Sequence, residues 1–228
     1  MSPTVFVHTR WDDGDRFGHV NNAAYLALIR DATDRVLGGA LTLATIEIEF
    51  RRPVPTNADI DVSVRPGEGT PESSLVEYEL SFEAHVCARA TARWRSSANT
   101  APELPGLQKD VGGAEFSWEH AVRSYEIGPG GALRPPAALQ WFEYAVYRAA
   151  ERVGWSAERM LAAGFVTLQI GHRLALGPTP RVGERLAIVS RLVEMRRVSG
   201  TWHHEARRDR RRARRGGPLA WRIPRRRG

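Results

Sequence analysis

Cysteine, lysine and long apolar runs are scarce in this sequence, and the shortage of cysteines and of apolar runs excludes whole classes of protein. The single cysteine among 228 residues, Cys87, excludes an internal disulfide framework and fits a reducing environment. It lies in an alternating, strand-like segment, which favours a packed thiol over a nucleophile. No apolar run approaches the roughly 18 residues of a membrane-spanning helix, and the first residues lack the basic and apolar regions of a signal peptide. We therefore expect a cytoplasmic protein with no membrane partner.

Metal and cofactor motifs are missing as well. No cluster of cysteine and histidine has the spacing of a zinc site. Residues 12–15 lack the ligand spacing of a calcium loop, and the glycine-rich residues 128–131 predict a tight turn instead of a phosphate-binding loop. His203 and His204 are adjacent, so on a strand they point to opposite faces and do not bind one ion. We expect neither a metal nor another cofactor.

Lysine is limited to Lys109, so the net charge of +7 comes from arginine, which is concentrated in one segment. Residues 207–228 hold eleven of the 33 basic residues and only one of the 26 acids, which leaves 22 bases against 25 acids in the rest. Three readings of this Arg-rich tail compete: a disordered arm, a patch for nucleic acid or acidic membranes, and a C-terminus that diverged from an ancestral strand. The third best explains why the alternating pattern stops there. We expect no nucleic-acid partner, because the body is acidic.

Residues 10–25, RWDDGDRFGHVNNAAY, form the most informative segment. Three carboxylates, a glycine, a histidine and two asparagines precede an apolar helical pattern made by Tyr25, Leu28, Ile29, Ala32 and Val36. Asn21 or Asn22 would cap this helix. The segment predicts a carboxylate and a histidine beside the positive end of a buried helix, where backbone donors polarise a carbonyl for attack by water. The same composition also fits an ordinary solvated loop with a helix cap.

The pattern that follows predicts an antiparallel sheet. Apolar residues alternate near 46–51, 60–64 and 76–94, and the last run is long enough to require a reversal at 83–85. A helix followed by such a meander is typical of a sheet wrapped around a helix.

The same order of elements then occurs a second time. Arg10 and Asp13 align with Arg123 and Glu126 at an offset of 113, and a Pro-x-Pro motif also repeats. We infer an internal duplication with domains at 1–96 and 115–206, a linker at 97–114, and a tail at 207–228 that is expected to be disordered and to leave the second copy incomplete at its C-terminus. The second copy has no acid or histidine in its loop, because Gly128 and Ala132 replace Asp15 and His19, and Arg134-Pro135 replaces the two asparagines.

Residues 13–22, DGDRFGHVNN, followed by Tyr25, resemble the signature of hotdog-fold thioesterases. The similarity extends to the 4-hydroxybenzoyl-CoA and acyl-CoA thioesterase group and to the catalytic segment of acyl-ACP thioesterases. It implies an α+β fold of tandem hotdog domains, each an antiparallel sheet around a central helix. Hotdog thioesterases are usually dimers with the active site between two units, so the tandem chain would be a pseudo-dimer, with or without further homo-oligomerisation. Acyl-ACP thioesterases have the same tandem layout with the active copy second, whereas here it comes first.

The resemblance also assigns roles within the segment. Asp15 corresponds to the family's catalytic aspartate, acting as a general base on water or as a nucleophile. His19 corresponds to a histidine that assists or orients in part of the family, and a loop histidine that bonds to backbone is the equal alternative. Asn22 would cap the helix or hold the water. Donors and contacts for the substrate carbonyl would come from Gly18, Val20, Asn21 and Tyr25.

Two further residues bear on the partner half and on the substrate. Glu143 lies on the second, largely apolar helix and is a candidate for the acid that some family members take from the partner's helix; a solvent-facing glutamate is the alternative. Phe17 stands where the acyl-ACP enzymes have an asparagine, which favours acyl-CoA. We therefore predict an acyl-CoA thioesterase. Acyl-ACP is the alternative substrate, and a non-catalytic acyl-thioester-binding protein is the alternative from another class.

Overall fold

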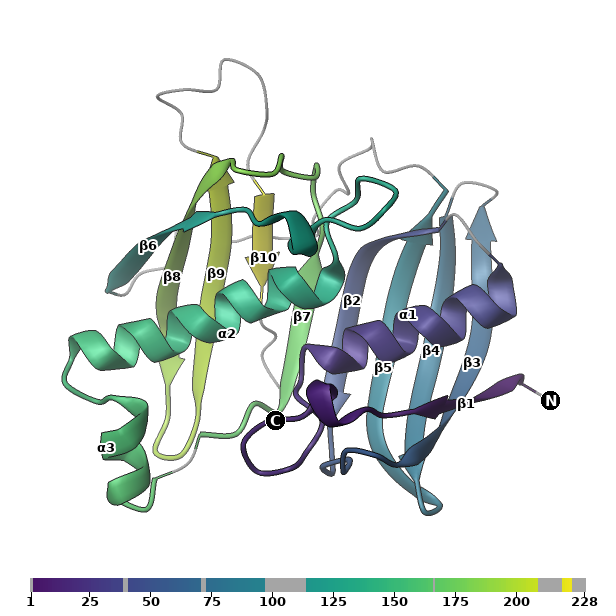
Figure 1. Cartoon of the computed structure of the whole chain (residues 1–228), viewed down its shortest axis with the longest axis horizontal. Helices are drawn as coiled ribbons and strands as arrows, with labels where there is room; N and C mark the ends of the chain where they lie inside the picture. Colours follow the sequence, from purple (N-terminus) through teal and green to yellow (C-terminus); the bar gives the residue numbers. More distant parts are fainter. Residues whose placement is uncertain are drawn as a thin grey trace. The chain divides into compact units, whose positions relative to one another are not determined.

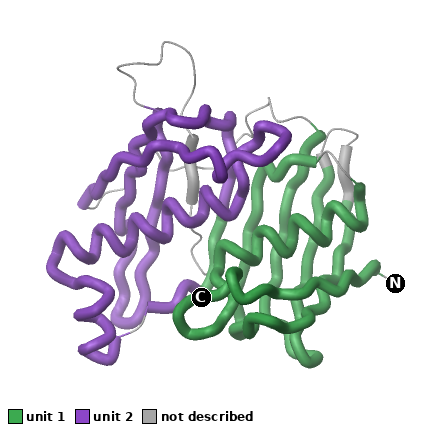
Figure 2. The backbone as a smooth tube through the Cα atoms, in the orientation of Figure 1, with its two compact units in different colours: residues 1–102, 170–173 green, residues 103–169, 174–228 purple. Residues whose placement is uncertain are grey.

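The computed structural model describes residues 2–38, 41–70, 73–96, 114–165, 167–208 and 219–222. It contains two compact units (Figure 2). Unit 1 comprises Met1–Pro102 with Ile170–Arg173, and unit 2 comprises Glu103–Gln169 with Leu174–Gly228. Apart from residue 114, the predicted linker lies outside the described residues. No helix in the described part of the chain is long and apolar enough to cross a membrane.

Unit 1 is an antiparallel sheet crossed by one helix (Figure 1). Its elements are β1 (Thr4–His8), the 3-10 helix η1 (Trp11–Asp13), α1 (Ala24–Leu37), β2 (Thr42–Phe50), β3 (Asp59–Thr70), β4 (Ser73–Phe82) and β5 (His85–Arg95). The strands pair in the order β1-β3-β4-β5-β2. The expected reversal is confirmed, because Glu83 and Ala84 join β4 to β5 with φ values of 48° and 61°, as a tight two-residue hairpin requires.

The helix of unit 1 buries the face that its periodicity predicts. Tyr25, Leu28, Ile29 and Ala32 are buried, as are the sheet residues Ile46, Ile48, Ile60, Val62, Leu80 and Trp94. A series of side-chain hydrogen bonds crosses this core. The Trp94 indole donates to the Tyr78 hydroxyl at 2.7 Å, and that hydroxyl is 2.7 Å from the hydroxyl of Thr33. The core is therefore apolar with its few polar groups paired, as burial requires.

Four residues from the second half of the sequence also belong to unit 1. The N–H of Phe50, at the end of β2, donates to the Ile170 carbonyl at 3.0 Å. A Cβ at Gly171 would lie 2.7 Å from the Ile48 carbonyl oxygen, so only glycine fits this approach. The guanidinium of Arg173 donates hydrogen bonds to the Glu47 carboxylate through both Nε and Nη2. The sequence pattern did not predict this addition to the sheet.

Unit 2 repeats the order of strand, 3-10 helix, long helix and meander. Its elements are β6 (Glu115–Ala121), η2 (Ser124–Glu126), α2 (Pro135–Arg152), α3 (Ala157–Ala162), β7 (Gly171–Ala175, whose first three residues belong to unit 1), β8 (Arg185–Met195), β9 (Gly200–Arg208) and β10 (Leu219–Arg222). Four of the strands pair antiparallel in the order β10-β9-β8-β6, and α2 lies across β8 and β9 (Figure 1).

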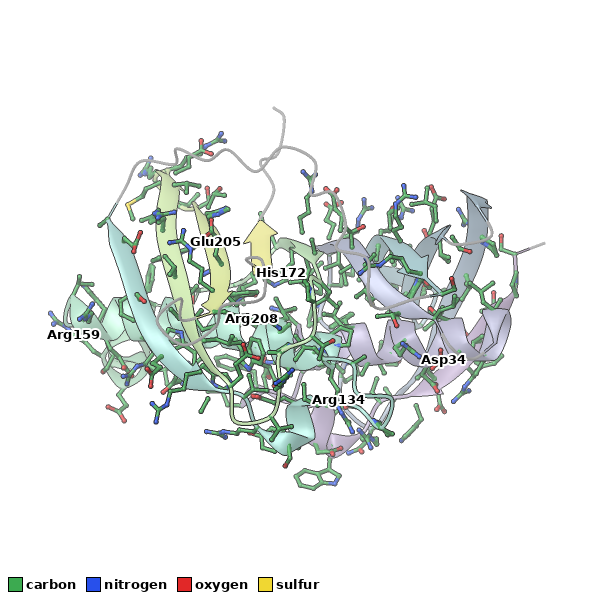
Figure 3. The ribbon with its side chains drawn as sticks, turned by 90° about the horizontal axis from the view of Figure 1, so that it is seen from above. Asp34, Arg134, Arg159, His172, Glu205 and Arg208 are labelled. Atoms are coloured by element: carbon green, nitrogen blue, oxygen red, sulfur yellow. The ribbon has the colours of Figure 1, made fainter. Side chains whose placement is uncertain are left out.

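Strand β9 continues two residues past the predicted end of the second domain at residue 206. Arg207 and Arg208 continue β9 and pair with β8. Arginines fit there because their charges are paired: Arg207 with Glu205, and Arg208 with Glu184 at 2.9 Å (Glu205 and Arg208 are labelled in Figure 3). A short strand, β10, pairs with β9 where β5 pairs with β4 in unit 1, with four residues against eleven, so the expected incompleteness of the second copy stays a prediction. Residues 209–218 and 223–228 of the tail lie outside the described residues.

Candidate active site in the loop before helix α1

The loop between β1 and α1 is shaped by Asp13. Its carboxylate accepts the N–H of Arg10 at 2.8 Å, and its carbonyl accepts the N–H of Asn21 at 2.8 Å. The two ends of the loop are therefore joined through one residue. Gly14 and Val20 form an antiparallel bridge just inside this closure, so residues 15–19 project as a tight turn.

Asp15 is fixed within that turn. Its Oδ1 atom accepts the N–H of Phe17 at 2.8 Å and the N–H of His19 at 3.1 Å. Its own N–H donates to the His19 carbonyl at 2.7 Å, and Gly18 closes the turn with a φ of +78°. Asp15 and His19 are both exposed. Within the described part of unit 1 the Oδ2 atom of Asp15 makes no hydrogen bond. The result is a carboxylate held in one orientation with one oxygen facing solvent.

The expected meeting of the Asp15 carboxylate with the N-terminus of the helix stays a prediction, because the bonds that orient Asp15 come from elsewhere. The N–H groups that bind its carboxylate belong to its own turn. Helix α1 begins at Ala24, and Asn21 satisfies the N–H groups at its start: the side-chain oxygen accepts the N–H of Ala23 and the carbonyl accepts the N–H of Ala24, both at 2.9 Å. The predicted cap at Asn21 or Asn22 is therefore wrong: the N-cap residue is Ala23, and no side chain caps the helix. Asn21 instead closes the turn just before the helix, and Asn22 is half-buried beside it.

The groups expected to polarise a substrate carbonyl are engaged inside the unit. The N–H of Gly18 donates to the Asp15 carbonyl at 3.1 Å, that of Val20 to Val54 at 2.7 Å, and that of Asn21 to Asp13. Tyr25 is only 2% exposed and packs edge-on against Phe50 at 5.1 Å. Burial raises the pKa of its hydroxyl, which faces the backbone of Val54. These four residues therefore hold the loop and the core together.

A second segment of unit 1 supports the turn from behind. His19 and Pro55 form an antiparallel bridge, flanked by the Val20–Val54 bond and by a bond from the N–H of Thr56 to the Gly18 carbonyl at 3.2 Å. A Cβ at Gly14 would lie 2.6 Å from the Thr56 side chain. The turn that carries Asp15 is thus packed on a segment that follows much later in the sequence.

Unit 2 has the same loop backbone without the acid. The N–H of Gly128 donates to the Ala132 carbonyl at 2.8 Å, the N–H of Gly131 returns to Gly128 at 2.9 Å, and Gly131 has a φ of +75°. The N–H of Arg134 donates to the Glu126 carbonyl at 2.8 Å, as that of Asn21 does to Asp13. Every one of these bonds is displaced by 113 residues from its counterpart, which supports the inferred alignment of the two copies.

Unit 2 instead contains a buried polar cluster that no pattern in the sequence indicated. Glu126 is 5% exposed and accepts the N–H of Arg123 at 2.7 Å and the indole N–H of Trp141 at 2.9 Å; its Oε2 is also 3.0 Å from the His120 ring. Burial by itself would raise the pKa of Glu126, but these partners together lower it below its usual value. The cluster is fully paired and inaccessible, which is the arrangement of a structural group.

Glu143 lies on α2 of unit 2, and its carboxyl group is buried, so the solvent-facing alternative is wrong. Burial raises its pKa to about 8. Since Asp15 belongs to unit 1, the role of Glu143 as an acid supplied by the partner half stays a prediction. Among the described residues no group of three or more His, Cys, Asp and Glu is arranged to hold a metal ion.

Residues 4–96 match the family model of the acyl-ACP thioesterase C-terminal domain. This match covers the unit that carries Asp15 and less than half of the chain. No curated protein matches the chain by sequence. The match supports a thioester hydrolase.

The fold of nearly the whole chain is similar to that of solved thioesterase structures. A provisionally assigned oleoyl thioesterase from Lactobacillus plantarum has a TM-score of 0.69 at 11% identity, with 96% of this chain and 95% of that chain covered. The 12:0-ACP thioesterase from Umbellularia californica gives 0.69 at 10%, covering 97% and 94%. An acyl-ACP thioesterase from Bacteroides thetaiotaomicron VPI-5482 gives 0.68 at 9%, covering 96% and 95%. At such identities the likeness concerns the fold alone, and it confirms the predicted hotdog-like α+β class.

Proposed function

We propose that the protein hydrolyses acyl thioesters with Asp15 as the catalytic carboxylate. The observation that carries the proposal is the fixed, exposed carboxylate of Asp15, held by the N–H groups of Phe17 and His19 in the unit that matches the thioesterase family model. A carboxylate that is already oriented loses little freedom on meeting its substrate, which favours catalysis.

The chemistry requires little else, because a thioester carbonyl is electrophilic and thiolate is a good leaving group. As a general base, Asp15 takes a proton from water through Oδ2 while the water oxygen attacks the carbonyl carbon. The tetrahedral intermediate collapses, the C–S bond breaks, and the thiolate leaves with the proton. As a nucleophile, Asp15 instead attacks the carbonyl carbon, the C–S bond breaks and the thiolate leaves; water then hydrolyses the resulting anhydride to the free acid and restores the Asp15 carboxylate. His19 is the candidate for proton transfer, and the Asn22 amide for holding the water or the oxyanion.

The carrier of the acyl group is proposed to be acyl carrier protein, with CoA as the alternative. Phe17 had favoured CoA in the sequence, because the acyl-ACP enzymes that the segment resembles have an asparagine there. The family match of residues 4–96 now supports the acyl-ACP alternative, since it extends over the whole of the first domain and not over one position. We also propose that the chain arose by duplication of one hotdog unit, the layout that the resemblance to acyl-ACP thioesterases implies.

The proposal is tested by removing one charge without disturbing the turn. Asp15→Asn keeps an oxygen that accepts the N–H groups of Phe17 and His19, so the loop should persist. We expect kcat to fall by about 10²-fold or more, the usual contribution of a general base, measured as thiol release from lauroyl-ACP and lauroyl-CoA. Asp12→Asn is the matched control, because it removes a charge from the same loop and only loosens an ion pair with Arg10 at 3.5 Å. Full activity in Asp15→Asn would show that the assignment is wrong.

A non-catalytic acyl-thioester-binding protein is the second candidate. It is favoured by one observation: Oδ1 of Asp15 bonds to the N–H groups of its own turn, as a purely loop-shaping aspartate would. Calorimetric binding of lauroyl-CoA or lauroyl-ACP by the wild-type chain, without thiol release from either, would support this candidate over the enzyme.

A further inference from the structure

Thr9, the residue after β1, is completely buried and makes several polar contacts. Its hydroxyl donates to the Pro55 carbonyl at 3.0 Å, with the Ala58 carbonyl 3.1 Å away, and accepts the N–H of Ala58 at 3.0 Å. Its backbone N–H donates to the Ala58 carbonyl at 2.8 Å. One side chain therefore ties the end of β1 to residues 55–58.

The carbonyl that Thr9 binds belongs to the segment behind the Asp15 turn. Pro55 forms the bridge with His19, and the N–H of His19 in turn donates to the Asp15 carboxylate at 3.1 Å. The hydrogen bonds of this bridge are made by the neighbouring residues, since the N–H of Val20 donates to the Val54 carbonyl and that of Thr56 to the Gly18 carbonyl. A series of contacts thus runs from the Thr9 hydroxyl through residues 54–56 and 18–20 to the carboxylate. If Pro55 moves, the donor that orients Asp15 moves with it.

Unit 2 shows that the fold does not need this hydroxyl. Val122 stands at the position of Thr9, is 2% exposed, and donates its N–H to the Glu184 carbonyl at 2.9 Å in the same way. Valine and threonine have nearly the same shape, so the packing is preserved while the polar contact is lost. The hydroxyl is present in the unit whose turn carries Asp15 and absent from the unit whose turn has Gly128 at the corresponding position.

We propose that Thr9 is a positioning residue for the Asp15 carboxylate, acting through Pro55 and His19. The inference depends on the proposed thioester hydrolysis, because its effect is exerted on the catalytic acid. Thr9 touches no substrate in this scheme. Its role is to hold the orientation of a group that does, and orientation errors of about 1 Å cost up to about 10²-fold in rate.

Thr9→Val in the full chain is the test, assayed as kcat and KM on lauroyl-ACP and lauroyl-CoA. We expect kcat to fall about ten-fold with KM unchanged, and Thr9→Ser, which keeps the hydroxyl, to retain most of the activity. Thr33→Val is the matched control: it removes another buried hydroxyl of unit 1, bonded at 2.7 Å to the Ile29 carbonyl and to Tyr78. We expect its kcat to stay within two-fold of wild type. An unchanged kcat in Thr9→Val, or an equal loss in Thr33→Val, would overturn the proposal.

A double variant separates positioning from simple loss of folded enzyme. In an Asp15→Asn background, Thr9→Val should lower kcat no further, whereas a merely structural effect would multiply in both backgrounds. Amide hydrogen exchange gives a readout that is independent of turnover: residues 15–20 should exchange faster in Thr9→Val and at the wild-type rate in Thr9→Ser. Unchanged exchange would refute the link to Thr9. Absence of turnover in the wild type would instead count against the proposed function.

Discussion

Glu126 should be one of the most sensitive positions for the stability of unit 2. Its carboxylate is 5% exposed and faces three donors, the N–H of Arg123, the indole of Trp141 and the ring of His120. Glu126→Gln preserves the shape and removes the charge. Because every neighbour donates, the amide NH₂ of glutamine must face a donor, and at least one buried N–H then loses its acceptor.

The expected cost follows from these contacts. A hydrogen bond to a charged group contributes about 1.5–3 kcal/mol, and a buried donor left without its acceptor costs about 1–3 kcal/mol. Glutamine still accepts from one side, so we expect a loss of about 2–4 kcal/mol. At an m-value of about 2 kcal/mol/M, the urea midpoint of unit 2 should fall by about 1–2 M.

The effect should depend on pH in a defined direction. The pKa of Glu126 is lowered in the folded protein, so the folded state binds its proton less readily than the unfolded state does. The stabilisation is therefore fully present above the unfolded value, about 4.3, and is lost as the pH falls through the lower folded value. The difference between wild type and Glu126→Gln should be complete at pH 7 and should shrink below about pH 4.

Tryptophan fluorescence in urea measures this directly, since Trp141 contacts Glu126. Glu119→Gln is the control, because Glu119 is an exposed acid on β6 that pairs with Arg185 at the surface, where such pairs contribute about 0–1 kcal/mol. If Glu126→Gln unfolded within about 0.5 kcal/mol of wild type, or if the gap stayed constant down to pH 3, the cluster would not be the buried anionic site described.

Two glycines give further predictions. At Gly171 a Cβ would lie 2.7 Å from the Ile48 carbonyl, so Gly171→Ala should push the backbone from β2 and cost about 1–3 kcal/mol, seen as a lower melting temperature; an unchanged melt would contradict the close approach. Gly18 has a φ of +78°, and a Cβ added there would meet nothing within 4 Å, so Gly18→Ala should cost only the backbone strain of about 1–2 kcal/mol, and Gly18→Asn less. Equal urea midpoints for alanine and asparagine at this position would argue against strain as the cause.

The parts of the fold that the sequence predicted are those with local, periodic causes. The apolar face of α1 and the reversal between β4 and β5 depend on residues three or four apart, or on two consecutive turn residues, and both are confirmed. The position of Ile170–Arg173 beside β2 depends on an approach between backbones that are far apart in sequence, and no periodicity encodes it. The continuation of β9 through Arg207 was missed because a run of like charges was judged without its acidic partners, Glu205 and Glu184.

In the candidate site, too, the sequence predicted the features that neighbouring residues determine and missed those that depend on distant segments. The motif located the loop and its turn, because both are set by neighbouring residues, but it misplaced the start of α1, where Ala23 is the N-cap and no side chain caps the helix. It gave no indication that the N–H groups of Gly18 and Val20 have acceptors within the unit, because one of these acceptors, Val54, lies in a distant segment. Thr9 carried no signal at all in the sequence, since a threonine at the end of a strand is ordinary and its partner, Pro55, follows 46 residues later.

The comparison between the two loops of this chain shows what a motif match can establish. The turn of residues 15–19 and that of residues 128–132 have the same backbone hydrogen bonds and a glycine with a positive φ at the same position. One turn has an acid and a histidine, and the other has neither. The backbone of the signature is thus a property of the fold, and it persists where the chemistry is absent. The proposed activity is therefore assigned to side chains in which the two loops differ, which is why Asp15→Asn, and not a variant of the glycines, discriminates an enzyme from a binding protein.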